Sequence, residues 1–301
     1  MSIASQLTTL VPSTPDDEKP TSENNGLLKD TRVSKIATQV TQDSLFIFNS
    51  CMFAFMSVSW IVCLSLTLTK AKYATIPWYT NFAGVRPDYS TTFDWAPVAK
   101  KWRDIHIGHF STVALFISSM YHLAISTKFK DYYFKDLSIG RNGMRWFDLI
   151  LSSFLMHIQL SMIIGYFDVH GNILIGAVAS TIMALSYLSE PEQDKKDTDY
   201  DPRPFYLSVV PFIILWSVLL CHFRYAYANA NNVPEWVTAL VITMATVDSL
   251  MMLHKWLTIK RIWIWKNYVF CEIVFVVLSV SMKQALAWVT FGGTLDTPDD
   301  N

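Results

Sequence analysis

The chain has 301 residues, 51% of them apolar and 14% aromatic, and its mean hydropathy is positive. This apolar content exceeds that of an ordinary soluble domain, so we predict an integral membrane protein that contacts the lipid bilayer. The formal net charge of −1 shows no basic excess that would favour a nucleic-acid partner.

Residues 1–44 form a polar N-terminal segment that is rich in Ser and Thr and contains no apolar block. We expect a flexible tail without a signal peptide. Only the end of this segment, where Val33, Ile36 and Val40 follow helical spacing, could form an amphipathic turn on the membrane surface.

Residues 45–295 contain seven nearly uncharged blocks of about twenty residues, each long enough to cross a hydrocarbon core of roughly 30 Å as a helix. We therefore predict an all-α membrane protein, a seven-transmembrane helix bundle, followed by an acidic C-terminal tail at 296–301. The predicted spans are residues 45–68, 105–127, 146–167, 171–189, 204–223, 235–255 and 268–292.

Seven spans place the two termini on opposite sides of the membrane. Of the 24 Lys and Arg residues, sixteen fall on the side of the N-terminus and seven on the other side. Because cytoplasmic connections are enriched in Lys and Arg, we predict a cytoplasmic N-terminus and a C-terminus outside. This orientation disfavours a G-protein-coupled receptor, whose N-terminus lies outside.

The first connection, about residues 70–103, is long and rich in Tyr, Trp, Thr and Pro. It could be a floppy connector or an ordered hairpin outside the membrane. His106 and His109 follow it at helical spacing, but two histidines without a third ligand do not predict a metal site. The four cysteines fall within or at the ends of spans, where we expect them to pack as small apolar side chains.

Ionisable residues inside the spans are few, and each costs about 2.5–3.5 kcal/mol at a helix centre, so they are candidates for function. Lys283 lies deep in the last span and Glu272 eleven residues before it. Asp248 lies in the middle of the sixth span. Asp148 lies in the third span, where helical spacing puts Arg145 and Ser152 on the same face.

A buried Lys with a buried carboxylate has three interpretations. The pair could be a structural ion pair between helices, or it could belong to an ion or substrate site of a transporter or channel. It could also be an aldehyde trap, in which a desolvated amine forms a Schiff base that needs a nearby carboxylate once it is protonated. Spacing alone leaves all three open.

From the third span onward the chain resembles the heliorhodopsins, a family of retinal proteins with seven helices and a cytoplasmic N-terminus. The matching segments are RWFDLILSSFLM (145–156), SYLSE (186–190), PEWV (234–237), HKWL (254–257) and CEIVFVVLSVSMKQALAWVTFGGTL (271–295). The last segment is the most specific, because Glu272, Ser279, Lys283 and the following ALAW are in register with the family.

The resemblance implies that Lys283 carries all-trans retinal, that Asp148 is the counterion and that Ser279 neighbours the Schiff base. It also implies a homodimer across the first connection, and a light-sensing photoreceptor rather than an enzyme. The further residues that we assign to the retinal site are Ser152, Met156, Phe212, Trp216 and Met251. The aromatic and methionine residues among them lie at spacings that any core or lipid-facing helix could also show.

The sequence departs from the family pattern at three places. The family's counterion is usually Glu, whereas Asp148 is one methylene shorter. The first span has no histidine, although His122 matches the family's second histidine. Asp248 falls where the family has an apolar or aromatic residue. We therefore add light-dependent proton permeation as a hypothesis, with these pathway candidates: His122, Arg145, Asp248, Glu190 and Glu272.

Overall fold

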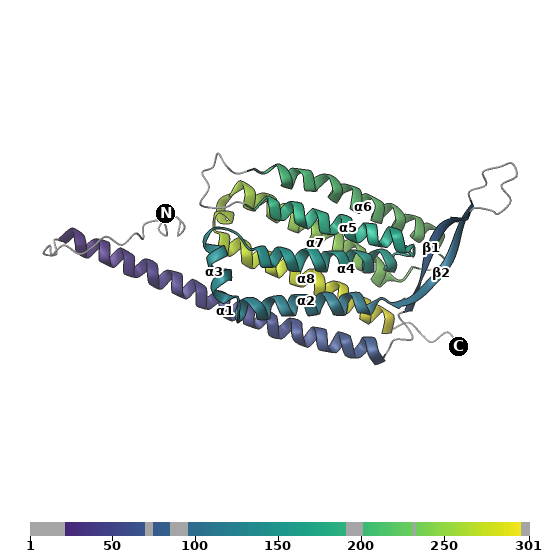
Figure 1. Ribbon diagram of the computed structural model, residues 1–301, viewed down its shortest axis with the longest axis horizontal. Helices are drawn as coiled ribbons and strands as arrows, with labels where there is room; N and C mark the ends of the chain where they lie inside the picture. Colours follow the sequence, from purple (N-terminus) through teal and green to yellow (C-terminus); the bar gives the residue numbers. More distant parts are fainter. Residues whose placement is uncertain (1–21, 70–74, 85–95, 191–200, 231–232, 296–301) are drawn as a thin grey trace.

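The computed structural model describes residues 22–69, 75–84, 96–190, 201–230 and 233–295. Within these residues seven helices run side by side as a bundle, with α3 (Lys130–Ser138) at one end and a two-stranded sheet at the other (Figure 1). We call these the α3 end and the hairpin end. The seven bundle helices are α1 (Ser22–Thr69), α2 (Gly108–Ser126), α4 (Gly143–Ile163), α5 (Val169–Leu188), α6 (Arg203–Asn229), α7 (Glu235–Lys260) and α8 (Tyr268–Leu295).

The helices have the length and composition of membrane spans. Six of them are long and apolar enough to cross a bilayer: α4 to α8, and α1 over Thr41–Thr69. Helices α2 and α3 are separated by a short break with a bend of 86°. Taken together they are also long and apolar enough to span the membrane, which gives up to seven spans. The predicted all-α, multi-pass membrane bundle is confirmed.

The bundle is apolar outside and partly polar inside. Large apolar side chains such as Ile61, Leu174 and Ile242 are exposed on its outer surface, as expected where helices face lipid. Buried polar side chains instead lie between helices, and α4 holds many of them because it buries a larger share of its span than any other spanning helix. Packing against α2, α5 and α8 encloses α4 and places its polar residues in the core.

The predicted N-terminal tail needs correction. The structure continues α1 back to Ser22, so residues 22–44 are helical rather than a flexible tail with one amphipathic turn. In Figure 1 this extension passes beyond the α3 end of the bundle. The expectations for residues 1–21 and for the C-terminal tail 296–301 lie outside the described residues.

The first connection contains an ordered hairpin, one of the two alternatives that the sequence allowed. Strand β1 (Thr75–Gly84) pairs antiparallel with β2 (Ala96–His106), with a register shift between Trp78 and Tyr79. Because β2 runs on to His106, helix α2 begins at Gly108 rather than at residue 105.

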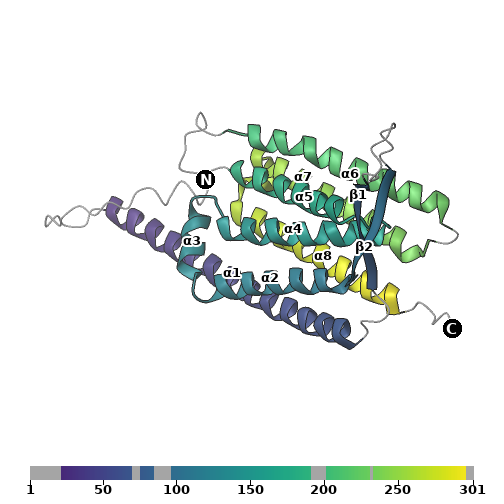
Figure 2. The same cartoon turned by 45° about the vertical axis from the view of Figure 1, so that its right-hand side comes forward.

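The hairpin is fixed to the bundle at the start of α5. The amide N of Tyr79 donates a 2.9 Å hydrogen bond to the carbonyl of Phe167. Trp78 is buried against Met162 and Val169, so the hairpin covers the ends of α4 and α5 (Figure 2). The turn between these helices contains Gly165 at φ +93°, a conformation that glycine adopts without strain.

Helices α4 and α5 pack closely at Gly176. A Cβ atom built there would lie 2.8 Å from a ring carbon of Phe154 and 2.9 Å from the Phe154 carbonyl oxygen. The carbonyl belongs to the α4 backbone, which cannot move aside without shifting the helix. Small residues at such contacts let two membrane helices approach each other.

We expect Gly176→Ala to lower the free energy of unfolding by about 1–3 kcal/mol, the usual cost of overpacking a core. Thermal unfolding in detergent measures this loss. Gly292→Ala on α8 is the matched control, because a Cβ there meets nothing within 4 Å and alanine favours a helix. Equal stability of Gly176→Ala and wild type would contradict the close packing of α4 on α5.

Candidate functional site

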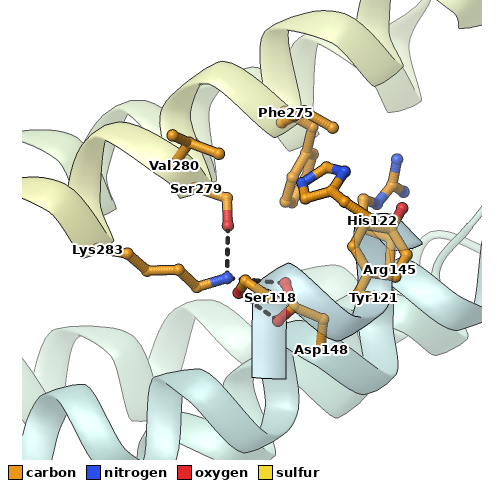
Figure 3. Close-up of a pocket in the computed structure, with 10 residues that line it drawn as sticks. Ser118, Tyr121, His122, Arg145, Asp148, Phe275, Ser279, Val280 and Lys283 are labelled. Carbon is orange, nitrogen blue, oxygen red and sulfur yellow. Dashed lines mark hydrogen bonds and ion pairs between the residues drawn. The ribbon is translucent and has the colours of Figure 1, made fainter. Parts of the chain in front are cut away.

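The deep lysine of α8 lies beside the predicted carboxylate of α4. The Lys283 ammonium donates to Asp148 Oδ2 at 2.7 Å and to Ser279 Oγ at 3.0 Å (Figure 3). Ser118 Oγ on α2 donates to the other Asp148 oxygen at 2.5 Å. The Lys283 and Asp148 side chains are only 1% and 5% exposed, so the structure contains a buried ion pair in which both carboxylate oxygens are bonded.

The local sequence sets the positions of Lys283 and Asp148 along their helices. Ser279 lies one turn before Lys283 on α8, so its hydroxyl reaches the same ammonium. Helix α4 is capped by Asn142, whose side-chain oxygen accepts a 3.0 Å hydrogen bond from the Arg145 amide. With the helix start fixed there, Asp148 lies in the second turn of α4 and faces α8.

A small polar pocket lies next to this pair, on the side of the α3 end. His122 and Tyr121 from α2 and Arg145 from α4 face it together with the pair (Figure 3). The full lining consists of Ser118, Tyr121, His122, Arg145, Asp148, Phe275, Val276, Ser279, Val280 and Lys283.

His122 contacts helix α1 through the side-chain amide of Asn49. Its Nδ1 atom lies 3.0 Å from Asn49 Oδ1, and both side chains are buried. Asn49 Nδ2 in turn donates to Tyr133 of α3 at 3.3 Å. The first helix, which has no histidine from Leu45 to Leu68, thus contributes an asparagine at this position. An amide does not take up a proton near neutral pH, so His122 is the titratable member of this contact.

Arg145 joins the pocket to a buried charge network at the α3 end. Its guanidinium is paired with Glu190 and with Glu272. Asn142 Nδ2 donates to Glu272 at 2.6 Å, and the hydroxyl of Tyr268 donates to Glu190 at 2.8 Å. The structure therefore brings together three of the pathway candidates, Arg145, Glu190 and Glu272. Glu272 itself lies eleven residues before Lys283 on α8.

The charges of this network balance. Arg145, Glu190, Glu272 and Lys255 are all buried, two cations with two anions. Burial alone would raise the pKa of the Glu190 carboxyl, which lies just beyond the end of α5, but the positive charges of Arg145 and Lys255 hold that pKa below its ordinary value. Glu190 is consequently an ionised partner of the arginine.

An apolar cluster adjoins the ion pair. Met156, Trp216 and Met251 belong to one buried core cluster, and Phe212 packs against it. Ser152, one turn after Asp148, is fully buried, and its hydroxyl has no hydrogen-bond partner among the residues that the structure describes. Apart from Lys283 and Ser279 on α8, the expected cofactor-site residues thus come from α4, α6 and α7 around a shared apolar core.

Asp248 lies at a separate place in the core. Its Oδ2 atom is 3.0 Å from His157 Nε2 on α4 and accepts a 3.1 Å hydrogen bond from Trp216 Nε1 on α6. Among the described residues no hydrogen bond joins Asp248 to Lys283 or to Asp148. Of the five pathway candidates, it alone stands apart from the pocket and the Arg145 network.

Several residues at these sites were not foreseen from sequence. Ser118, Asn49 and Tyr268 depend on contacts between helices, which spacing along one helix does not reveal. His157 had a usable signal, because it is an imidazole within a largely apolar stretch of the third predicted span. Toward the hairpin end, Gln159 accepts from Ser111 at 2.6 Å and donates to Thr290 at 3.3 Å, a third polar group.

The chemistry available to this arrangement is narrow. A buried primary amine beside a carboxylate can form a covalent linkage to an aldehyde and hold it protonated. Within the described part of the chain, no group of three or more His, Cys, Asp or Glu residues could hold a metal ion.

Comparisons with known proteins agree with this geometry. The heliorhodopsin family profile matches residues 45–295. No curated protein matches the sequence. Among solved structures, the crystallographic structure of xanthorhodopsin, a light-driven ion pump with dual chromophore, is similar with a TM-score of 0.56 and 12% identity, covering 85% of this chain and 95% of that one. This likeness shows a shared fold. The family match covers well over half of the length of this chain, so the chain belongs to the heliorhodopsin family.

Proposed function

We propose that the protein is a membrane photoreceptor that binds all-trans retinal covalently on Lys283. Membership of the heliorhodopsin family and the rhodopsin fold support a retinal-binding membrane photoreceptor. The observation that carries the assignment to Lys283 is its buried amine, 2.7 Å from Asp148 and beside an apolar core. Retinal supplies light absorption and isomerisation, so the protein is a sensor rather than an enzyme.

The residues around Lys283 fit this group. The linkage needs a primary amine with a carboxylate nearby, and Lys283 and Asp148 supply both. The polyene needs apolar surroundings, for which the cluster of Met156, Trp216 and Met251 is suited. Ser152, one turn after Asp148 on α4, is buried between the ion pair and this cluster along the helix.

In this proposal each residue near Lys283 has a definite task. Asp148 is the counterion, and its anion favours a protonated nitrogen on Lys283. Ser118 holds the carboxylate in position through Oδ1, and Ser279 accepts from the nitrogen at 3.0 Å. His122 faces the same pocket and, as an imidazole, could take up a proton there.

Two further proposals concern orientation and assembly. The α3 end faces the cytoplasm, which puts the N-terminus inside and the hairpin outside, as the distribution of Lys and Arg favours. Two copies form a homodimer across the hairpin, where Trp102 is 59% exposed and stacks on Trp78.

The alternative is a transporter or channel without a chromophore that uses Lys283, Asp148 and Asp248 as an ion pathway. The match to the heliorhodopsin family favours the photoreceptor over this alternative. A purely structural ion pair is the remaining interpretation, and the family match likewise favours the photoreceptor over it.

Lys283→Ala is expected to abolish visible absorption after expression with retinal, because alanine has no amine for the linkage. The spectrum of the purified protein measures this. Since the change leaves a buried carboxylate unpaired, the double variant Lys283→Ala/Asp148→Asn removes both charges and tests the same point in a neutral core.

Lys255→Arg is the matched control for the lysine. Lys255 is also buried, on α7, and its replacement keeps the positive charge near Glu190. This variant should remain coloured. A coloured Lys283→Ala protein would defeat the assignment of the linkage.

Asp148→Asn is expected to shift the remaining visible band to the red and to make that band disappear at a lower pH than in wild type. The carboxylate stabilises the ground state, in which the positive charge lies nearest Lys283, and it favours the protonated form. Spectra recorded over a pH series measure both effects. Asp148→Glu keeps the charge and should restore both properties, whereas an unchanged Asp148→Asn spectrum would assign the counterion to another acid.

We also propose light-dependent proton permeation, with Glu190 or Asp248 as the carrier. Support for Glu190 comes from its pairing with Arg145, which lines the pocket beside Lys283. Support for Asp248 comes from its contact with His157, a second titratable group in the core. Chains of carboxylates and imidazoles are the usual proton relays in membranes.

Photocurrents under voltage clamp at several pH gradients test this proposal. We expect a light-dependent current that reverses with the proton gradient and is largely lost in Glu190→Gln or in Asp248→Asn. Each variant must keep its visible absorption, which shows that the buried network still folds. Absence of current at every voltage would leave a sensor only, and a current that survives both changes would refute the route.

A further inference from the structure

Asp248, His157 and Trp216 form a polar site in the middle of the bundle, held by three different helices. The three side chains are at most 6% exposed. Two ring nitrogens converge on one carboxylate oxygen, Asp248 Oδ2: His157 Nε2 lies 3.0 Å from it, and Trp216 Nε1 donates to it at 3.1 Å. The other oxygen, Oδ1, is buried and has no hydrogen-bond partner within the described residues.

The hydrogen bonds of His157 decide where its protons are. Nδ1 lies 2.9 Å from the Ser153 carbonyl oxygen and 3.3 Å from the Ser153 hydroxyl. The carbonyl is the closer of the two and only accepts, so this geometry favours a hydrogen on Nδ1. Nε2 then faces Asp248 Oδ2 at 3.0 Å, and this contact must contain a proton because two lone pairs would repel each other. Since Trp216 also donates to Oδ2, the arrangement favours a carboxylate anion that accepts from an imidazolium and an indole.

The negative end of this pair faces the apolar core. On α7, Asp248 lies four residues after Met244 and three before Met251, so the three side chains share one face. Both methionines belong to the core cluster that contains Met156 and Trp216. On the other side of the pair, Nδ1 of His157 contacts the backbone carbonyl of Ser153 on its own helix.

The site also lies away from Lys283. His157 follows Asp148 by nine residues on α4, which corresponds to about 13 Å along the helix toward the hairpin end at 1.5 Å per residue. The apolar cluster borders both places, because it includes Leu149 of α4 next to Asp148 and Met282 of α8 next to Lys283, as well as Met244 and Trp216.

We propose that the Asp248 carboxylate, held by His157 and Trp216, is a colour-tuning site for the chromophore. The proposal rests on the proposed function, in which Lys283 would hold retinal and the residues of the core cluster would surround its apolar part. On absorbing light, such a chromophore would carry its positive charge farther from the lysine. A fixed anion near the apolar part therefore stabilises the excited state more than the ground state and shifts the absorption of the protein to longer wavelength.

The absorption maxima of wild type and Asp248→Asn, both loaded with retinal, test the tuning. Asparagine has the same shape without the charge, so the maximum of Asp248→Asn should lie at a shorter wavelength. His157→Gln is the second variant: without the imidazolium the buried carboxyl takes up a proton, and the shift should have the same direction. Thr246→Val, on the exposed face of α7 two residues away, is the matched control and should leave the maximum unchanged.

A measurement without retinal tests the charge itself. In retinal-free protein with ¹³C-labelled aspartate, the infrared difference between wild type and Asp248→Asn should contain the stretch of an ionised carboxylate. In His157→Gln the same carboxyl should appear as a protonated acid. A protonated acid at Asp248 in wild type would overturn the charge pair.

The possible failures are distinguishable. A coloured wild type whose Asp248→Asn and His157→Gln maxima are unchanged, or lie at longer wavelength, overturns the tuning role and leaves the photoreceptor intact. A wild type that stays colourless with retinal contradicts the photoreceptor, and the tuning role with it.

Discussion

The structure depends on one interaction, the ion pair of Lys283 and Asp148 in the centre of the bundle. Taking two charges out of water is costly, and removing one partner of a buried pair typically destabilises a protein by about 3–5 kcal/mol. The pair is tolerated because Ser118 and Ser279 complete its hydrogen bonds. These four residues come from α2, α4 and α8, so a requirement for satisfied charges also fixes how three helices face one another.

The rest of the polar interior follows the same constraint in separate groups. At the α3 end, Arg145 and Lys255 are balanced by Glu190 and Glu272. In the core, Asp248 is paired with His157, and toward the hairpin end Gln159 is hydrogen-bonded to neutral hydroxyls. Water does not reach these atoms from the lipid side, so each polar group must find its hydrogen-bond partners among neighbouring side chains. The polar interior is therefore divided into separate clusters, each with its own set of partners.

Sequence patterns predicted the spans well because a membrane helix must be apolar over its whole crossing length. They failed at α1, where the helix continues to Ser22 through a polar stretch that composition assigned to a tail. They also placed Lys283, Asp148 and Ser279 correctly along their helices. What they could not supply is which helices face each other, so the Asn49 contact with His122 and the His157 contact with Asp248 emerged only from packing.

The central claim, that Lys283 carries retinal, has a direct chemical test. Borohydride reduction of the retinal-loaded protein converts the linkage into a stable amine, and mass spectrometry of the peptides then locates the modified lysine. The account predicts one retinyl group per chain, on the peptide that contains Lys283. A retinyl group on Lys255, the other lysine buried in the bundle among the described residues, or no modified lysine at all, would contradict it.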